Sequence, residues 1–290
     1  MRKFLFILAL LSFHFGAAQK IDFLKLGKYR VSYLPDSLKE NSGLIFRAEK
    51  LYTFNDGANS SEIFEIDQRS GNIKNVLNAN LENRDWEAIT TDSVHIYIGD
   101  FGNNGGMRKN LRIYKIPVRD TLISDPVQTL PYFYPEQKDF TRRPLNHDFD
   151  AEAMVFMKGK IHIFTKEWLS KATTHYSINP QTVGNQPAEK LETFETGFMV
   201  TDASYFEGKL YLVGYTKKTG VFLSVFNETE PGIFFREKPR KYYLGSAISI
   251  GQIEGIAVNG EGVYISGEEF NSPFGKTGPA FYFIPGNKLK

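Results

Sequence analysis

The sequence predicts an all-β fold, a five-bladed β-propeller of four-stranded antiparallel blades, and three observations support that expectation. A short phrase led by an oxygen-bearing residue recurs five times along the chain. Ten residues after the start of each phrase comes the middle of an apolar and aromatic strand. Aromatic residues make up 14% of the chain, and their short runs end at turn residues without a sustained helical period. Such a fixed internal offset indicates a repeat architecture.

The five phrases are Ser42-Gly43-Leu44, Glu87-Ala88-Ile89, Glu152-Ala153-Met154, Asp202-Ala203-Ser204 and Glu254-Gly255-Ile256. Their starts lie 45, 65, 50 and 52 residues apart, which is the scale of a propeller blade. The longest interval holds one blade and an insertion, because a second blade would need about 40 further residues. We place the insertion at residues 118–150, where prolines at positions 126, 131, 135 and 144 interrupt any regular strand.

Each repeat predicts strands in the same order. Blade one is expected to have strands at residues 42–46, 50–54, 62–67 and 72–77, and blade two at residues 86–90, 95–99 and 110–117. Blade three is expected to have strands at residues 151–157, 160–166 and 174–178, and blade four at residues 202–206, 209–215 and 221–226. Blade five is expected to have strands at residues 254–258, 262–269 and 280–285. Blade five lacks an outer strand, whereas a strand-like stretch at residues 21–33 precedes blade one. If that stretch completes blade five, the ring closes without a long unpaired edge.

The beginning of the chain has the pattern of a secretory signal peptide. Arg2 and Lys3 precede an apolar run over residues 4–13, and Gly16-Ala17-Ala18 supplies a small-residue cleavage site. The run is shorter than the roughly 20 apolar residues that span a bilayer, and no later stretch is long and apolar enough. We therefore expect residues 1–18 to be removed, residues 19–290 to form a single propeller domain without a membrane span, and the protein to be secreted or periplasmic.

Composition narrows the chemistry and the partners. The chain has no cysteine, which excludes disulfides and thiolate metal sites. Residues 19–290 carry 33 basic and 33 acidic side chains, because Arg2 and Lys3 are the only charges in residues 1–18. A net charge of zero provides no field for nucleic acid, so no nucleic-acid partner is expected.

The leading residues of the five phrases are the candidate metal ligands. In a propeller the innermost strands line a central channel, so Ser42, Glu87, Glu152, Asp202 and Glu254 are expected to converge there. Two unit charges about 5 Å apart repel by roughly 3 kcal/mol at an effective dielectric near 20, so four ionised carboxylates repel by about 10 kcal/mol or more in total. Either some are protonated or a cation lies among them. Oxygen ligands favour Ca²⁺, with Mg²⁺ second. The alternative is that the acids bond backbone amides of neighbouring blades around a channel filled with water.

Polar residues that follow the second strands are expected to surround the mouth of the channel, where function usually lies. Asp56 and Asp100 are candidate general bases there. His147 is a further candidate acid or base, because it lies in the polar insertion shortly before Glu152. The glycine-rich residues 99–106 allow close approach of the backbone to a ligand but do not form a nucleotide P-loop. His162 and the two tryptophans are expected to pack in the core.

These motifs resemble the five-bladed propellers of the calcium-activated nucleotidase (soluble apyrase) family. The similarity rests on the phrases Glu40-Asn41-Ser42-Gly43-Leu44, Asp85-Trp86-Glu87-Ala88-Ile89, Ala151-Glu152-Ala153, Asp202-Ala203-Ser204-Tyr205 and Ile253-Glu254-Gly255-Ile256, on the turn Asn55-Asp56 and on the glycine turn at residues 99–104. The resemblance implies one axial calcium held by an oxygen from each blade. The family has a serine where Asp202 stands, a double aspartate where Asn55-Asp56 stands, and basic and aromatic nucleotide-binding residues that have no counterpart here.

The same phrases are similar to two other groups of exported propellers, the phytase-like esterases and the SdiA-regulated proteins. Two functions follow as expectations. One is a calcium-binding propeller that hydrolyses a phosphate ester or anhydride of a small phosphorylated molecule, with Asp56 or Asp100 as general base. The other is a binding propeller without catalytic activity, in which calcium is structural and the loops bind a protein or glycan.

Overall fold

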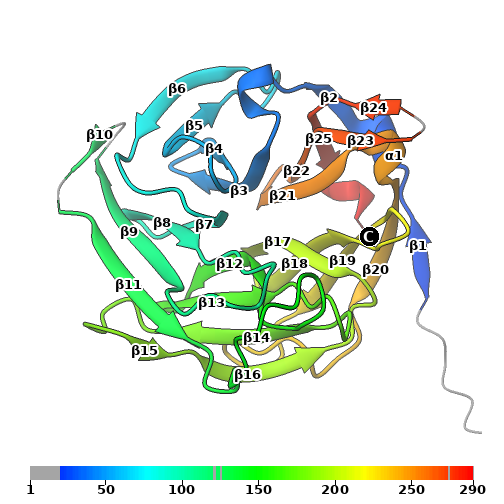
Figure 1. Ribbon diagram of the computed structural model, residues 1–290. Helices are drawn as coiled ribbons and strands as arrows, with labels where there is room; N and C mark the ends of the chain where they lie inside the picture. Colours follow the sequence, from blue (N-terminus) through cyan, green and yellow to red (C-terminus); the bar gives the residue numbers. More distant parts are fainter. Residues whose placement is uncertain (1–19, 120–121, 125, 274, 290) are drawn as a thin grey trace, which may run out of the picture.

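The computed structural model of the chain describes residues 20–119, 122–124, 126–273 and 275–289. Its strands form five small antiparallel sheets around a central axis, and the strands β3, β7, β12, β17 and β21 surround that axis (Figure 1). The predicted five-bladed propeller is therefore confirmed. The expected signal peptide at residues 1–18 lies outside the described residues.

The blades follow one another along the chain, from the innermost strand outward. Blade one consists of β3 (Asn41–Arg47), β4 (Lys50–Asn55), β5 (Glu62–Ile66) and β6 (Ile73–Asn78), and blade two of β7 (Trp86–Thr91), β8 (His95–Asp100), β9 (Arg112–Arg119) and β11 (Gln128–Phe133), with the short β10 (Leu122–Ile123) and β15 (Gln186–Pro187). Blade three consists of β12 (Ala151–Met157), β13 (Lys160–Thr165), β14 (Thr173–Ile178) and β16 (Glu189–Phe194), and blade four of β17 (Met199–Phe206), β18 (Lys209–Tyr215), β19 (Gly220–Asn227) and β20 (Arg240–Ser246). Blade five consists of β21 (Gln252–Asn259), β22 (Gly262–Glu268) and β25 (Ala280–Pro285).

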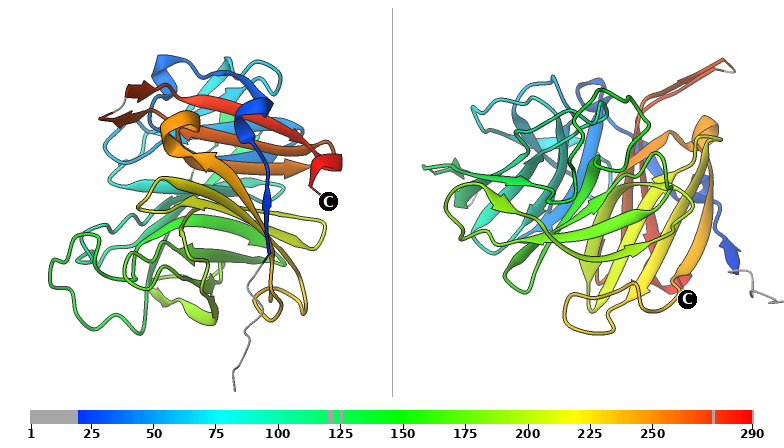
Figure 2. Two further views of the ribbon diagram at one scale, coloured as in Figure 1. Left: turned by 90° about the vertical axis from the view of Figure 1, so that its right-hand side faces the viewer. Right: turned by 60° about the horizontal axis from the view of Figure 1, so that its bottom comes forward.

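Helical structure is scarce among the described residues. It comprises α1 (Ala247–Ile250) and three single 3-10 turns, η1 (Leu26–Tyr29), η2 (Asp36–Leu38) and η3 (Gly286–Lys288). None of these described helices has the length and apolar character needed to cross a membrane. A separate hairpin, β23 (Phe270–Ser272) and β24 (Gly275–Thr277), projects away from the ring after β22 (Figure 2).

The N-terminal stretch closes the ring, as predicted, and it does so across two blades. The strand β2 (Arg30–Tyr33) pairs with β25 and becomes the outer strand of blade five. The preceding strand β1 (Ile21–Phe23) pairs in parallel with β20 of blade four. One short segment therefore joins the last two blades and covers an outer edge of each, which ties the start of the chain to its end.

We expect removal of residues 20–33 to destabilise the whole domain. Without β2 the edge of β25 is unpaired, and Tyr282, which is 0% exposed, becomes uncovered. The melting temperature should fall by about 10 °C or more relative to a chain that begins at residue 19, because several kcal/mol of pairing and burial are lost. Thermal unfolding of the two chains checks this, and equal melting temperatures would contradict the closure described above.

The stretch expected to be an insertion is only partly irregular. β11 pairs with β9 as the fourth strand of blade two, and β10 forms a short hairpin with the end of β9. Pro131 lies within β11, where its missing N–H is tolerated because β11 is an outer strand. The long loop that remains runs from residue 134 to residue 150.

The core lies between neighbouring blades, in five separate clusters of buried apolar residues. Second strands such as β8 and β13 are buried over nearly their whole length, because each blade is covered by a neighbour on both faces. This burial explains their continuous apolar sequence. Outer strands such as β16 are half exposed and carry no comparable pattern, which explains why the fourth strands of blades two, three and four were not predicted.

His162 lies in the core between blades three and four, as expected, and has a polar partner there. Its Nδ1 atom lies 2.7 Å from Nε2 of His175, whose Nδ1 atom lies 3.0 Å from Oε1 of Glu192. The Glu192 carboxylate also accepts backbone N–H groups of Phe234 and Phe235. Burial lowers the pKa of His162 to about 3. Below about pH 6.5 the unfolded chain therefore takes up a proton that the folded chain does not, so His162 contributes stability that is lost as the pH falls.

Candidate functional site

Every inner strand contains a register shift at the repeated phrase. In each blade one residue of the inner strand is left without a partner on the second strand, which is the signature of a β-bulge. The five extra residues are Gly43, Glu87, Glu152, Thr201 and Glu254. Bulges change the direction of a side chain and are common next to functional sites. Three of the five predicted ligands therefore occupy one structural position, in blades two, three and five.

The other two predicted ligands do not occupy that position. Ser42 lies one residue before the bulge in its strand, and Asp202 lies one residue after. The five predicted ligands therefore do not occupy equivalent positions, although the hydroxyl of Ser42 still lies beside blade two, where it donates to the carbonyl oxygen of Glu87. A fixed offset counted along the sequence does not reveal the bulge. It also does not reveal that the hairpin formed by the first two strands of blade one is shorter than that of blade two. The residue after the bulge pairs with a residue nearer in sequence in blade one, Leu44 with Thr53, than in blade two, Ala88 with Gly99.

A polar cavity of about 320 Å³ lies at the start of the inner strands. Its lining residues come from three places: the inner strands, the ends of the second strands, and the loops above them. They are Ser42, Asp56, Glu87, Asn104, Leu145, Glu152, Lys166, Trp168, Tyr215, Gln252, Glu254 and Glu268. Four of the five predicted metal ligands and one of the three predicted catalytic residues are therefore brought together.

A lysine already provides positive charge in this cavity. Lys166 follows β13 and is only 4% exposed, and its ammonium group donates a hydrogen bond to Oε1 of Glu152. The same ammonium lies 5.0 Å from the ring centre of Trp168 and 5.2 Å from that of Tyr215. Burial is the largest single influence and opposes the charge of Lys166, but the acidic groups around it, Glu152 first, together raise the pKa of the lysine well above its ordinary value. Lys166 is therefore an ammonium ion in a cavity of carboxylates.

The remaining carboxylates of the cavity exceed what one lysine can neutralise. Burial raises the pKa of Glu254 to about 8, and that of Glu268 to about 8. Burial and the carboxylate of Glu152 raise the pKa of Glu87 well above its ordinary value. The side-chain amide of Gln252 donates to both Glu254 and Glu268 and holds these two groups together. In the free protein at neutral pH several of these acids are accordingly protonated.

Asp56 is the predicted catalytic residue that lines the cavity. It follows β4, and its Oδ1 atom accepts a hydrogen bond of 3.0 Å from the side chain of Asn59. Burial, together with the nearby carboxylates of Glu40 and Asp85, raises the pKa of Asp56 to about 7. A carboxyl group with this pKa exchanges protons readily at neutral pH.

The glycine-rich turn of blade two makes room for acids. A side chain at Gly102 would place its Cβ atom 2.3 Å from Oε1 of Glu87 and 2.6 Å from Oδ2 of Asp85. A side chain at Gly57 would similarly lie 2.6 Å from Oδ1 of Asp85. The close backbone approach predicted for residues 99–106 therefore serves, at Gly102, the carboxylates of the protein itself.

Asp202 holds blades together and does not line the cavity. Its Oδ2 atom accepts the backbone N–H groups of Leu44 at 3.2 Å and of Ile256 at 2.6 Å, and its Oδ1 atom accepts that of Ala203 at 2.8 Å. These donors belong to blades one, five and four. The alternative considered above, in which the acids bond the amides of neighbouring blades, describes this residue.

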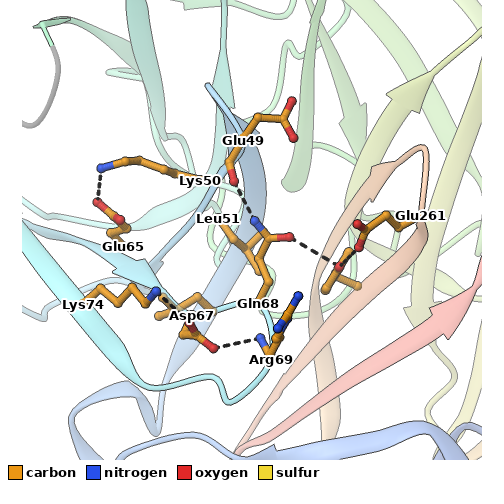
Figure 3. Close-up of a pocket in the computed structure, with 11 residues that line it drawn as sticks. Glu49, Lys50, Leu51, Glu65, Asp67, Gln68, Arg69, Lys74 and Glu261 are labelled. Atoms are coloured by element: carbon orange, nitrogen blue, oxygen red, sulfur yellow. Dashed lines mark hydrogen bonds and ion pairs between the residues drawn. The ribbon is translucent and has the colours of Figure 1, made fainter.

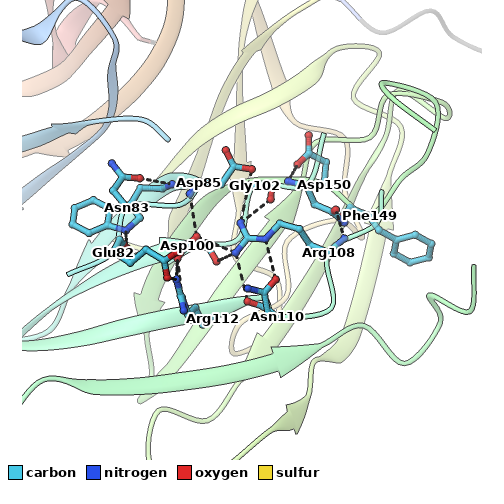
Figure 4. Close-up of polar contacts among 12 residues, drawn as sticks. Glu82, Asn83, Asp85, Asp100, Gly102, Arg108, Asn110, Arg112, Phe149 and Asp150 are labelled. Carbon is cyan, nitrogen blue, oxygen red and sulfur yellow. Dashed lines mark hydrogen bonds and ion pairs between the residues drawn. The ribbon is translucent and has the colours of Figure 1, made fainter. Parts of the chain in front are cut away.

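The carboxylate of Asp100 forms ion pairs with two arginines and is not part of the cavity lining. It is 0% exposed, and Figure 4 shows its carboxylate between Arg108 and Arg112. Arg108 donates to Oδ1 at 3.0 Å, Arg112 donates to Oδ2 through Nε at 2.8 Å, and the backbone N–H of Asp85 also donates to Oδ1. This arrangement does not support the predicted role as a general base. It fixes the turn that carries Asp85 and Glu87.

His147 is also engaged within the fold. Its Nδ1 atom accepts the backbone N–H of Phe149 at 3.1 Å, and its Nε2 atom lies 3.2 Å from the carbonyl oxygen of Asn104. Only the tautomer with a proton on Nε2 satisfies both contacts. The ring packs against Gly106 and is 4% exposed, so His147 joins the long loop of residues 134–150 to the glycine-rich turn.

Trp168, Tyr215 and Glu268 line the cavity but were not among the predicted metal ligands or catalytic residues. Trp168 was expected only to pack, yet its ring faces Lys166 and its Nε1 atom donates to Asp150 at 3.0 Å. Tyr215 and Glu268 lie at the ends of second strands. This position was expected to surround the channel mouth, and the structure places both side chains in the cavity lining.

The described part of the chain contains no cluster of three or more histidine, cysteine, aspartate or glutamate side chains that is ready to hold a metal ion. A larger pocket, of about 400 Å³, lies away from the axis between blades one and five. There Lys50 pairs with Glu65 at 2.9 Å and Lys74 pairs with Asp67 at 2.8 Å (Figure 3). Because these charges neutralise one another, the axial cavity is the stronger candidate site.

Comparison with known proteins supports the architecture. The sequence matches no protein-family model and no curated protein. Among solved structures the fold is similar to one from Thermus thermophilus described as an oxidoreductase (glucose dehydrogenase), with 13% identity, a TM-score of 0.50, and coverage of 88% of this chain and 98% of that chain. At this identity the likeness shows the propeller fold alone.

Two further solved structures are more distant. One is hydrazine synthase of Kuenenia stuttgartiensis, with 7% identity, a TM-score of 0.43, and coverage of 83% of this chain and 58% of that chain. The other is described as a 6-phosphogluconolactonase from Bacteroides uniformis, with 13% identity, a TM-score of 0.39, and coverage of 88% of this chain and 72% of that chain. The chain therefore spans little more than half of the hydrazine synthase chain. The comparisons do not place it in the calcium-activated nucleotidase family.

Proposed function

We propose that this protein is an exported propeller that binds a hard divalent cation, Ca²⁺ in first place, in its axial cavity. The observation that carries the proposal is the charge of the cavity. Its described lining includes five carboxylates, those of Asp56, Glu87, Glu152, Glu254 and Glu268, against the single ammonium of Lys166. Full ionisation would leave a net charge of −4 in a buried space, so a divalent cation is favoured electrostatically.

The oxygen chemistry of the cavity suits such an ion. The Oε2 atom of Glu152 is buried and has no hydrogen-bond partner among the described residues, although a buried carboxylate oxygen normally has one. The hydroxyl of Ser42 donates to the carbonyl oxygen of Glu87, which leaves its own lone pairs available. Glu87, Glu152 and Glu254, with Ser42, would hold the ion, and water would complete the 6 to 8 oxygen ligands that Ca²⁺ takes.

Hydrolysis of a phosphate ester or anhydride is the second part of the proposal, and Asp56 favours it. When bound, the ion would polarise a phosphate oxygen of the substrate. Asp56 lies on the cavity wall with a pKa of about 7, so at neutral pH its carboxylate can accept a proton from an attacking water. Lys166 and the aromatic rings beside it would orient the substrate. The competing function is a binding propeller in which the cation is structural.

Assays of the purified protein separate these functions. Nucleoside diphosphates and phosphomonoesters are supplied with CaCl₂ or with chelator, to the wild-type protein, to Asp56→Asn and to a surface control, Glu195→Gln. Hydrolysis that needs Ca²⁺, is retained by the control and falls about 100-fold or more in Asp56→Asn is expected, because general-base catalysis contributes about that factor. Ca²⁺ binding without turnover on any substrate would exclude the hydrolase and retain the binding propeller. No response to Ca²⁺ at all would exclude both.

A further inference from the structure

We propose that Lys166 is a tethered competitor for the cation, and that it makes the axial cavity select divalent over monovalent ions. The inference rests on the proposed function, because it concerns the same cavity. It starts from a different observation, which is that the cavity holds a cation of the protein's own. The side chain of Lys166 is 5% exposed, and its ammonium bonds Glu152, one of the residues assigned to the metal ion.

The surroundings of Lys166 form a site for a singly charged cation. A carboxylate oxygen accepts a hydrogen bond from the ammonium, and the faces of Trp168 and Tyr215 lie 5.0 and 5.2 Å from it. Aromatic faces attract cations, most strongly where water is excluded. The free protein therefore stabilises one positive charge in this cavity without any ion from solution.

An incoming monovalent ion gains little in this cavity. To reach Glu152, Na⁺ or K⁺ must displace an ammonium of equal charge and break its hydrogen bond and ring contacts. The positive charge in contact with the carboxylates would not change, because one unit charge replaces another. A divalent ion brings twice the charge, so its attraction to the five carboxylates exceeds what the loss of the Lys166 contacts costs. Competition with Lys166 therefore makes the cavity bind divalent cations in preference to monovalent ones.

Displacement of Lys166 would also change the carboxylates of the free protein. Among the described residues no group of three acids is arranged for a metal ion, and Oε1 of Glu152 accepts a hydrogen bond from Lys166. Displacement of the ammonium would free Oε1 of Glu152 beside the unpartnered Oε2 atom. Binding of the divalent ion and movement of Lys166 are then one event.

The test compares metal-free wild-type protein with Lys166→Met, which keeps most of the side-chain length without its charge. Lys217→Met is the matched control, because Lys217 lies 5.6 Å from the ring centre of Trp168 but is not among the lining residues of the cavity. Melting temperatures are measured in NaCl and in N-methylglucamine chloride at equal ionic strength, and the Kd for Ca²⁺ is measured by calorimetry.

The wild-type protein and Lys217→Met should melt at the same temperature in both salts. Lys166→Met should be stabilised by Na⁺ and should bind Ca²⁺ about tenfold more tightly or better, because a competing unit charge is gone. The inference would be overturned, and the proposed function would remain, if the melting temperature of Lys166→Met did not rise in NaCl. The same conclusion would follow if Lys166→Met bound Ca²⁺ no more tightly than the wild-type protein. Ca²⁺ binding by Lys166→Met alone would support the inference and contradict the proposed function. Binding of no cation by either protein would overturn both.

A second readout needs no change at Lys166. Trp168 faces the ammonium, whereas the second tryptophan, Trp86, is fully buried in the core between blades one and two. Because the emission of an indole responds to a nearby charge, Ca²⁺ should change the tryptophan fluorescence of the wild-type protein, and Trp168→Phe should lose that change. Unaltered emission of wild-type protein with Ca²⁺ bound would show that Lys166 stays in place and would overturn the inference.

Discussion

Replacing Asp202 with alanine is expected to lower the free energy of unfolding by about 3 kcal/mol or more, since each buried donor left without a partner costs roughly 1–3 kcal/mol. Three backbone N–H groups would lose their acceptor, those of Leu44, Ala203 and Ile256. The residue is 0% exposed, so water cannot replace the carboxylate without opening the junction of blades one, four and five. Thermal or denaturant unfolding measures the loss, which corresponds to a fall of about 6 °C or more in melting temperature.

Two further variants make this result specific. Asp202→Asn keeps the shape but turns an amide NH₂ toward N–H donors, so it should recover only part of the lost stability. Glu195→Gln removes an acid on the exposed surface and should change the melting temperature by less than about 2 °C. If Asp202→Ala were as stable as the wild-type protein without added cation, and lost only its response to Ca²⁺, Asp202 would be a metal ligand as the repeat first indicated.

Raising the pH from 6.5 to 8.5 is expected to destabilise the metal-free protein. The folded-state pKa values of Glu254 and Glu268 are raised to about 8, above their unfolded values near 4.5. Each group therefore contributes stability that is fully present below the unfolded value and is lost as the pH rises through about 8. The loss over this interval is about 2 kcal/mol for each group. His162, whose pKa is lowered to about 3, adds no slope above pH 6.5.

Substitution and added cation should both remove this slope. Glu254→Gln and Glu268→Gln replace an acid that must be protonated by an amide that is always neutral, so each variant should lose part of the pH dependence. Saturating Ca²⁺ should stabilise the wild-type protein most at pH 8.5, where the carboxylates are ionised. Melting temperatures of the metal-free proteins across the interval provide the measurement. A wild-type protein that gains stability with pH would contradict the burial of uncompensated acids in the cavity.

The sequence predicted the blades because their apolar strands are buried on both faces. Second strands such as β8 and β13 carry a continuous apolar pattern, and their positions agree with the structure within a few residues. The outer strands β11, β16 and β20 were not predicted, because half-exposed strands mix polar and apolar residues. The division of the N-terminal stretch between blades four and five was not visible either, since β1 and β2 have no distinctive pattern.

The candidate site was predicted in composition and not in geometry. Glu87, Glu152 and Glu254 were identified because the acid recurs at one place in the repeat, and the bulge gives them one structural position. A bulge leaves no mark in the spacing of residues, so the sequence grouped Asp202 with the other four candidate ligands, whereas its carboxylate accepts backbone N–H groups of three blades. Coulomb repulsion alone predicted that these acids are partly protonated or have a cation among them. The ion pair of Lys166 with Glu152 could not be derived, because the direction of the lysine side chain depends on the end of β13 and on the rings around it.

The most direct measurement of the central claim is a calorimetric titration of the metal-free wild-type protein with Ca²⁺ at pH 7, repeated in buffers of different ionisation enthalpy. Carboxyl groups that are protonated in the free protein because their pKa values are raised must release those protons when a cation binds to them. We expect one Ca²⁺ per chain and the release of about one proton or more for each ion bound. Absence of binding, or binding without proton release, would contradict the claim that the axial cavity holds more acids than its lysine can neutralise.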